Sequence, residues 1–260
     1  MIERTISVRG GAFQTEVFEA GTGPPLLYLH GVGYLPADDP FLQLLATTHH
    51  IIAPHMPGFG NSTGSEHLFD IHDLIYYELD LLDTLGLYGL PVAGHSLGAM
   101  VAAELAAVQP ERFTALVMIA PLGLWNPEYP VADFFSMSPT EVARATYYNA
   151  ESPTARAAAA PARDDEGYIA FMLDRAKSLA TAAKYLWPIP NRGLAGRLHR
   201  VAAPTLLVWG ESDGIVPPQY AQEFQRLIPQ ARLETIAEAR HLPQVEQPER
   251  LAQAVLEFLR

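Results

Sequence analysis

"LPVAGHSLGAMVAAELAAV", residues 90–108, is the stretch that decides the fold. It opens with a short apolar run at 90–93, which suits a strand buried on both faces. It ends in a compact, Ala-rich segment at 97–108 that is typical of a buried helix. Between the two lies "GHSLG" at 94–98. A G-x-S-x-G pattern between a buried strand and a helix predicts a sharp turn that presents its serine outward.

Ser96 stands at the centre of this turn and is the predicted nucleophile. A strained strand-to-helix turn leaves no room for side chains two positions before and after its centre, which accounts for Gly94 and Gly98. The following helix also directs the positive end of its dipole at negative charge that forms beside the serine. The alternative is that Ser96 only caps the helix. The buried run before it and the small-residue helix after it favour the nucleophile.

Apolar runs and helical patterns alternate along the rest of the chain. Residues 2–9 and 12–19 alternate apolar and polar side chains around two glycines, which predicts a hairpin. Amphipathic helices are predicted at 71–85 and 248–259. Together these patterns predict an α/β fold with a mostly parallel sheet covered by helices on both faces. The further runs that we interpret as buried strands are 26–30, 50–53, 115–120 and 205–209.

The alternation stops between about residues 122 and 200. This stretch is rich in prolines and aromatic residues and predicts several short helices without strands. Because nearly 80 residues are too many for an ordinary connection, we predict a helical cap at 122–200. The core domain would then consist of residues 1–121 and 201–260, and the alternative is a loose helical surface layer. Trp125 and Trp187 are predicted to line the substrate pocket, although packing inside the cap explains them equally well.

His241 is the predicted general base. A serine hydroxyl is a poor nucleophile at neutral pH, so it needs a neighbouring base, and the base needs a third group that fixes its tautomer. His241 follows the apolar segment 231–237 and precedes the last predicted helix. A loop at this point lies at the same edge of a parallel sheet as Ser96, which is where open α/β sheets place their sites. The alternative is a solvated loop histidine.

Asp213 is the predicted group that orients this base. It lies in "LLVWGESDGIVPP", just after the predicted strand 205–209 and therefore at the same edge of the sheet. Its carboxylate could accept a hydrogen bond from His241. Two alternatives remain open: Asp213 could cap the turn that it begins with Gly214, or Glu211 could take the orienting role.

The negative oxygen of a tetrahedral intermediate needs preorganised N–H donors. The residue after the nucleophile supplies one of them, here the backbone N–H of Leu97. The sequence "LYLHGVGY" places a glycine-bearing loop after a buried strand, and Val32 is the predicted second donor of this oxyanion hole, with Gly33 as the alternative. The other interpretation is that the glycines only form a tight turn.

The composition excludes several classes of protein. The chain has 260 residues, and 49% apolar against 18% charged residues argue against wholesale disorder. A formal net charge of −12 repels phosphate backbones and anionic membranes, so neither nucleic acid nor a membrane is an expected partner. We expect a small-molecule, ester-like substrate and a monomer or homodimer. The N-terminus resembles no signal peptide and no apolar run is long enough to span a membrane, which predicts a cytoplasmic protein.

No metal and no cofactor are predicted. The chain has no cysteine, which removes disulfides, thiol nucleophiles and thiolate metal sites together. Five of its nine histidines gather between residues 49 and 72, but their spacing matches no common zinc pattern. His30 and His95 are expected to organise backbone near the oxyanion loop and the nucleophile turn instead of acting as bases.

Five blocks resemble the α/β-hydrolase superfamily, specifically its capped single-domain members, in order: "LLYLHGVG", "IIAPHMPGFGNS", "VAGHSLGAMVAAELA", "APTLLVWGESDGIVP" and "ARHLPQVEQPERL". The resemblance covers nearly the whole chain, and the order Ser96, Asp213, His241 is that of the family. It implies an eight-stranded, mostly parallel sheet with the cap inserted after the sixth strand. Relatives often have Asp where His55 stands and Gly where Arg240 stands, and neither departure removes a triad group.

The fold does not fix the reaction. A serine nucleophile argues against the dehalogenases and epoxide hydrolases of this superfamily, which use Asp at that position. We predict a serine hydrolase that cleaves carboxylic esters or lactones of small, fairly apolar substrates through an acyl-enzyme. The alternative is a carbon–carbon bond hydrolase of ring-cleavage diketones, although such enzymes typically carry Asn where His95 stands and Trp where Leu242 stands. An alternative of another class is a non-catalytic ligand-binding protein, which would normally lack a triad member.

Overall fold

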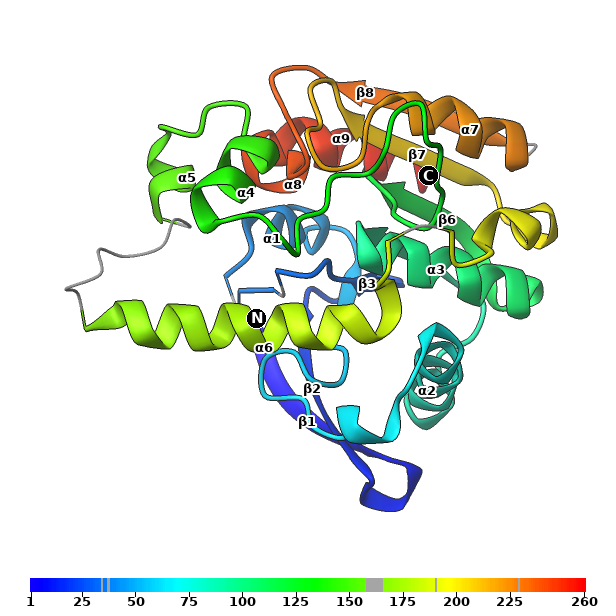
Figure 1. Cartoon of the computed structure of the whole chain (residues 1–260). Coiled ribbons are helices and arrows are strands. Elements are labelled where there is room, and N and C mark those ends of the chain that lie inside the picture. The colour runs from blue at the N-terminus through cyan, green and yellow to red at the C-terminus, as the bar shows by residue number, and fades with distance from the viewer. Residues whose placement is uncertain (34, 37, 158–165, 190, 229) are drawn as a thin grey trace.

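The structure is a computed structural model of the chain, and it describes residues 1–33, 35–36, 38–157, 166–189, 191–228 and 230–260. An eight-stranded sheet forms its centre, with the order β1-β2-β4-β3-β5-β6-β7-β8 (Figure 1). β1 pairs antiparallel with β2 and β2 antiparallel with β4, and all other neighbours are parallel, as predicted. The strands are β1 Ile2–Val8, β2 Phe13–Ala20, β3 Pro25–Leu29, β4 His50–Pro54, β5 Leu90–His95, β6 Phe113–Ile119, β7 Thr205–Gly210 and β8 Ala231–Ile236.

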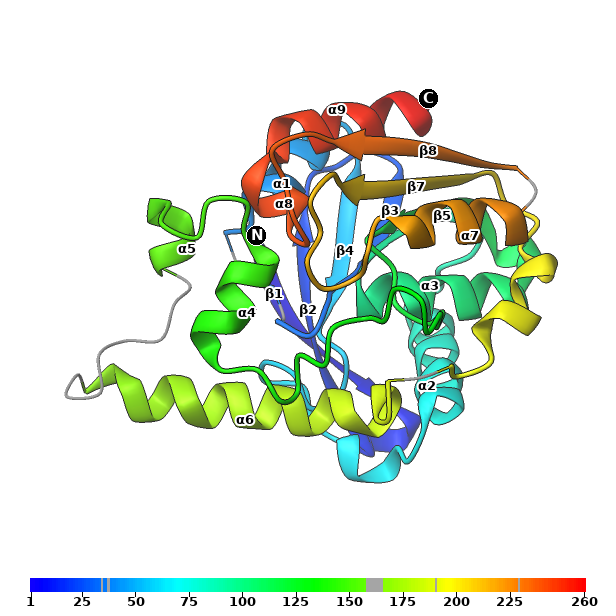
Figure 2. The same cartoon turned by 45° about the horizontal axis from the view of Figure 1, so that its top comes forward.

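Helices cover both faces of this sheet, and the views agree on their placement. The set α1, α8 and α9 lies on one face, and α2, α3 and α7 lie on the other (Figures 1 and 2). Their bounds are α1 Pro40–Leu45, α2 Ile71–Thr84, α3 Leu97–Val108, α7 Gln219–Leu227, α8 Pro243–Glu246 and α9 Pro248–Phe258. The helices predicted at 71–85, 97–108 and 248–259 therefore form as expected.

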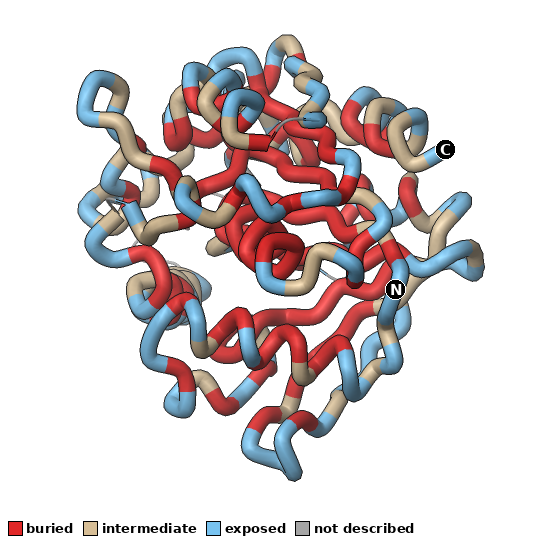
Figure 3. Tube along the Cα trace, turned by 90° about the vertical axis from the view of Figure 1, so that its right-hand side faces the viewer, coloured by how far each residue is buried: buried red, intermediate tan, exposed pale blue. Residues whose placement is uncertain are grey.

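The continuous apolar runs exist because the strands are buried on two sides. In β3, Leu27 and Leu29 belong to the core cluster that includes residues of α2 and α3. Leu26 and Tyr28 belong to the second cluster, which includes residues of α1 and α9. Successive strand residues point to opposite faces of a sheet, so a strand covered on both faces needs apolar residues at every position. Buried residues accordingly concentrate in the middle of the molecule (Figure 3).

Residues between β6 and β7 form the longest connection. It contains α4 Pro139–Thr146, α5 Pro153–Ala157, α6 Gly167–Leu186 and the short 3-10 helices Leu194–Gly196 and Leu198–Arg200. Its described part contributes no strand to the sheet, and its position after the sixth strand is the one expected. The division of the chain into a core and a cap at 122–200 stays a prediction.

The long helix α6 lies against the loop that follows β4 and against α2. Lys177 Nζ donates to the carbonyl oxygen of Gly60 at 2.8 Å, and Thr181 Oγ1 donates to the carbonyl oxygen of Gly58 at 3.3 Å. The side chain of Tyr185, near the end of α6, is buried in the core cluster that also holds α2. Among the described helices, none combines the length and the apolar character that a membrane span requires.

Candidate active site

The turn between β5 and α3 has the strain that the sequence pattern predicts. Ser96 has φ 54° and ψ −112°, a conformation that residues other than glycine rarely adopt. A Cβ on Gly94 would lie 2.4 Å from the carbonyl oxygen of Gly98. A Cβ on Gly98 would lie 2.1 Å from the carbonyl oxygen of Leu29, at the end of β3. The first glycine therefore allows the turn itself, and the second allows α3 to pack against the neighbouring strand.

The structure brings the three predicted catalytic side chains together. Ser96 follows β5, Asp213 follows β7 and His241 follows β8, so all three lie at the carboxyl edge of the parallel sheet. The distance from Ser96 Oγ to His241 Nε2 is 3.0 Å, and the distance from His241 Nδ1 to Asp213 Oδ2 is 2.9 Å. All three residues are buried. A carboxylate that accepts from Nδ1–H leaves Nε2 as the acceptor that faces the serine hydroxyl.

Asp213 uses both of its carboxylate oxygens. Oδ1 accepts from the backbone N–H groups of Ile215 at 2.8 Å and Val216 at 3.0 Å, while Oδ2 faces His241. Asp213 therefore caps the turn and also bonds the imidazole of His241, and its orienting role in catalysis stays a prediction. Glu211, the rival carboxylate, is exposed, and Asp213 is the carboxylate that bonds the imidazole.

The loop that carries Val32 lies against the nucleophile turn. A Cβ on Gly31 would lie 3.3 Å from Cβ of Ser96 and 2.6 Å from Nδ1 of His95. Val32 is partly buried and packs against the core, and Leu97 is the buried first residue of α3. These positions fit two backbone donors that flank the serine. The assignment of Val32 and Leu97 to an oxyanion hole stays a prediction.

His95 fixes the loop that carries the base. Its Nε2–H donates to the backbone carbonyl oxygen of His241 at 2.8 Å. Burial lowers the pKa of His95 to about 3, with His241 nearby acting in the same direction, so this imidazole stays neutral at physiological pH. The hydrogen bond confirms the expectation that His95 organises backbone.

His30 fixes the loop that carries Val32. Its Nε2 accepts from the backbone N–H of Met56 at 3.0 Å, and its Nδ1–H donates to the carbonyl oxygen of Gly31 at 2.6 Å. Burial lowers the pKa of His30 to about 3, and the neighbouring His55 contributes in the same direction. The loop next to Ser96 is thus tied to the segment that follows β4.

The sequence did not reveal the partner of His55. His55 Nδ1 pairs with the buried carboxylate of Glu16 on β2, and its Nε2 accepts from the backbone N–H of Leu35 at 3.2 Å. Asn61 also donates to Glu16, from Nδ2 at 2.6 Å. Burial alone would raise the pKa of Glu16, but the bonds from Asn61 and His55 bring it below its ordinary value.

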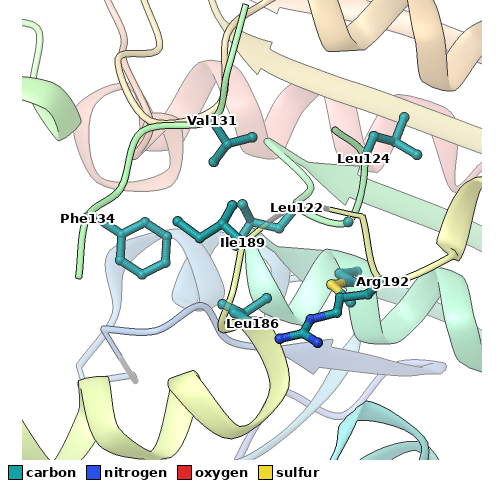
Figure 4. Close-up of a pocket in the computed structure, with 9 residues that line it drawn as sticks. Leu122, Leu124, Val131, Phe134, Leu186, Ile189 and Arg192 are labelled. Carbon is teal, nitrogen blue, oxygen red and sulfur yellow. The ribbon is translucent and has the colours of Figure 1, made fainter. Parts of the chain in front are cut away.

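A small apolar pocket of about 10 Å³ lies between α3 and the connection that follows β6 (Figure 4). Its lining includes Met100, one turn after Ser96, and Leu122, whose backbone N–H donates to the carbonyl oxygen of Ser96 at 3.3 Å. The full lining is Met100, Leu122, Gly123, Leu124, Val131, Phe134, Leu186, Ile189 and Arg192.

Trp125 and Trp187 are not among the residues that line this pocket, and their assignment to the substrate pocket stays a prediction. Trp125 packs partly buried against the hydrophobic core. Trp187 is 52% exposed, and its ring meets Phe135 edge-on with centroids 5.5 Å apart. Phe134 and Leu186 are among the residues that line the pocket, and the sequence did not single them out as wall residues. An aromatic residue in a helical connection carries no mark that separates a pocket wall from outer packing.

No group of three or more potential metal ligands occurs among the residues that the structure describes. The histidines between 49 and 72 separate in space into different contacts. His55 pairs with Glu16 in the interior, while His50 lies near Glu19 at the surface, with 3.0 Å between Nε2 and Oε2.

The strand order and the position of the Ser96 turn are those of an α/β hydrolase. Residues 24–248 match the family model of the α/β hydrolase fold, and the chain belongs to this family. It is 28% identical to the pimeloyl-(acyl-carrier protein) methyl ester esterase of Photobacterium profundum, over 95% of this chain and 98% of that one. It is 30% identical to polyketide synthase ThaQ of Burkholderia thailandensis over its full length, but spans only 13% of that protein.

Among solved structures, a meta-cleavage product hydrolase from Pseudomonas fluorescens IP01 has a TM-score of 0.79 at 19% identity, over 98% of this chain and 97% of that one. This likeness shows the shared fold. The family and the relatives together support hydrolase activity in general.

Proposed function

We propose that the protein hydrolyses carboxylic esters or lactones of small, fairly apolar substrates through an acyl-enzyme. One observation carries the proposal, namely the unbroken line of hydrogen bonds from Ser96 through His241 to Asp213. A buried carboxylate, an imidazole in a fixed tautomer and a hydroxyl within bonding distance are what serine nucleophilic catalysis requires.

The proposed reaction has two halves. In the first, Oγ of Ser96 attacks the ester carbonyl carbon while Nε2 of His241 takes the hydroxyl proton. The resulting oxyanion accepts from the backbone N–H groups of Val32 and Leu97. The intermediate then collapses, His241 returns the proton to the leaving alcohol, and the acyl group stays on Ser96.

In the second half, water replaces the alcohol. His241 takes a proton from the water as its oxygen attacks the acyl carbon, and then gives that proton to Oγ of Ser96 as the acid leaves. Asp213 remains ionised throughout and stabilises the imidazolium that forms in each half. The water oxygen ends in the acid product and the enzyme returns to its starting state.

The lining of the pocket supports an apolar acyl or alcohol group. Eight of its nine lining residues are apolar or glycine, and Met100 and Leu122 connect it to the serine turn. Small-molecule sites bind mainly by burying apolar surface, with a few polar groups that set orientation. With a volume of about 10 Å³, this pocket would have to widen to admit a substrate group.

Carbon–carbon bond hydrolysis is the second candidate, favoured by the structural likeness to a meta-cleavage product hydrolase. The residues next to Ser96 and His241 argue against carbon–carbon bond hydrolysis. Position 95 carries an imidazole instead of a side-chain amide, and its Nε2–H donates to the carbonyl oxygen of His241. Leu242 offers no ring N–H after the histidine.

The test is a parallel screen of purified wild-type protein and Ser96→Ala with p-nitrophenyl esters of several chain lengths, lactones and a vinylogous diketone. We expect ester or lactone turnover by the wild type and none by Ser96→Ala. Diketone cleavage without ester cleavage would replace the proposal with the second candidate.

A fluorophosphonate probe separates an enzyme from a ligand-binding protein on the same fold. We expect the probe to label the wild type at Ser96 and to leave Ser96→Ala unlabelled. A wild type that is folded, unlabelled and inactive on every substrate would favour the binding protein.

A further inference from the structure

Arg192 places a guanidinium group in the otherwise apolar pocket next to the serine turn. Figure 4 shows its side chain beside Leu186, with the planar group directed into the space between α6 and α3. Its Nε and Nη2 atoms are buried and have no hydrogen-bond partner among the described residues. A buried N–H without an acceptor destabilises the protein, and more so when the group is charged.

The protein does not supply an acceptor from the neighbouring acidic residue. Glu104 on α3 is buried, and both of its oxygens are already bonded by Arg197, from Nε at 2.7 Å and Nη2 at 2.5 Å. Arg197 Nη2 also donates to the backbone carbonyl oxygen of Arg192 at 2.9 Å. The backbone that carries Arg192 is therefore anchored to the helix that begins at the nucleophile, while its side chain is left for another acceptor.

The two unpartnered nitrogens form one edge of the guanidinium plane. Nε–H and the nearer N–H of Nη2 point in the same direction, and this edge matches the two oxygens of a carboxylate in a bidentate pair. The chain as a whole carries 29 acidic and 17 basic side chains, so an anion needs a local cation in order to bind.

We propose that Arg192 is a specificity residue that binds a carboxylate of the substrate, so that the preferred substrates are esters carrying a free carboxylate. The proposal rests on the proposed ester hydrolysis at Ser96. Met100 and Leu122 place the pocket next to the serine turn. The pocket of about 10 Å³ would have to widen to admit such a substrate, whose aliphatic part would then lie along the apolar lining while its carboxylate reaches Arg192. The carboxylate could belong to the acyl part or to the alcohol part of the ester.

The experiment compares each carboxylate ester with a neutral isostere. On the acyl side, monomethyl esters of dicarboxylic acids with four to eight carbons are compared with methyl esters in which an isopropyl group replaces the carboxylate. On the alcohol side, 4-acetoxybutanoate is compared with 4-methylpentyl acetate. In one of the two arms we expect wild-type kcat/KM to favour the carboxylate by about tenfold or more, as a charge-assisted bidentate pair would give.

Three substitutions test the residue. Arg192→Gln should lower the carboxylate-to-neutral ratio of kcat/KM by about tenfold, and Arg192→Lys should keep part of it because an ammonium is a point charge. Arg250→Gln removes the same charge from the exposed side of α9 and should keep the wild-type ratio. Thermal unfolding of each variant checks that it is folded.

A wild-type ratio of one or below at every length in both arms would overturn the proposal, and so would an unchanged ratio in Arg192→Gln. If the wild type hydrolyses no ester at all, the proposed function fails on its own. In that case, calorimetric titration of wild type, Arg192→Gln and Arg250→Gln with adipate still decides the anion site. Binding lost only in Arg192→Gln supports the site, and equal or absent binding overturns it.

Discussion

At the scale of single residues, Asp213 divides its two carboxylate oxygens between two tasks. One oxygen holds the turn through the N–H groups of Ile215 and Val216, and the other holds His241. An amide in place of the carboxylate keeps the first task, because its oxygen still accepts from the turn. It reverses the direction of the hydrogen bond to His241, because its NH₂ group would donate to Nδ1 instead of accepting from it.

We therefore expect Asp213→Asn to remain folded and to lose about 10⁴-fold in kcat, because the imidazole is held in the wrong tautomer. The measurement is kcat on the best ester from the screen, together with the thermal midpoint. Activity within tenfold of the wild type would mean that another carboxylate orients His241.

The side chain of His95 helps to position His241 by donating to the backbone carbonyl oxygen of that residue. His95→Phe keeps a ring of similar shape but removes the donor to the carbonyl oxygen of His241. We expect kcat to fall by about tenfold to a hundredfold with little change in KM, since a small displacement of the base weakens catalysis more than binding. His95→Gln, which retains a side-chain N–H, should recover part of the loss. Equal kcat values for both variants and the wild type would remove this positioning role.

At the residue level, the positions of side chains could be predicted where a chemical requirement left a pattern in the sequence. Ser96, Asp213 and His241 each follow an apolar run at the same edge of the sheet, and the structure brings their side chains within hydrogen-bond distance. Neither the pairing of Glu16 with His55 nor the position of Arg192 in its pocket could be inferred from a sequence pattern. Their significance depends on which distant segments pack together, and one sequence does not record that.

At the scale of elements, the position of α3 is set by its closest approach to β3. A methyl group on Gly98 would meet the carbonyl oxygen of Leu29 at 2.1 Å, and a backbone atom cannot turn aside as a flexible side chain can. Gly98→Ala must therefore shift the helix and, with it, the turn that holds Ser96.

We expect Gly98→Ala to lower the free energy of unfolding by about 1–3 kcal/mol and to reduce kcat as well. Gly196→Ala is the matched control, because no atom lies within 4 Å of the added carbon there. Urea unfolding and ester turnover on both variants provide the check. If Gly98→Ala proved as stable and active as Gly196→Ala, the packing of α3 would not depend on this contact.

The elements of the sheet were predictable because burial on both faces demands uninterrupted apolar runs, as in β3 and β6. For the connection after β6, the sequence predicted that helices form but not where each helix begins and ends. Their bounds depend on local caps, such as the capping box of Ser138 and Glu141 that begins α4, and on contacts with α2 and the loop after β4. Residues 158–165 of this predicted cap lie outside the described residues.

At the scale of the whole molecule, α2 is covered on two sides. Its apolar stripe packs into the core, and α6 also contacts it. Glu78 lies within this stripe, three residues after Ile75 and four before Leu82, and is buried. Both carboxylate oxygens of Glu78 lack a partner among the described residues. Burial raises the pKa of Glu78 to about 8.

A pKa that is higher in the folded protein than in the unfolded chain means that the folded state holds the proton more tightly. Stability should therefore fall as the pH rises from about 4.5 to 8. We expect this part of the loss to be on the order of 5 kcal/mol at most, at 1.36 kcal/mol per pKa unit.

Glu78→Gln should remove that part of the pH dependence, because the amide does not titrate. The measurement is the free energy of unfolding in urea at pH 5, 7 and 9. Glu249→Gln, at an exposed position on α9, should keep the wild-type profile. A Glu78→Gln profile parallel to the wild type would show that the burial of Glu78 does not govern stability.

Because the connection between β6 and β7 is one continuous stretch of chain, it can change in evolution independently of Ser96, Asp213 and His241. Ser96, Asp213 and His241 all belong to segments that precede or follow this excursion, and β6 and β7 pair directly with each other on either side of it. Insertions, deletions or wholesale replacement between the two strands would leave every ladder of the sheet in register. New specificities can thus arise by replacing one continuous stretch of a gene, while the three proposed catalytic groups are inherited unchanged.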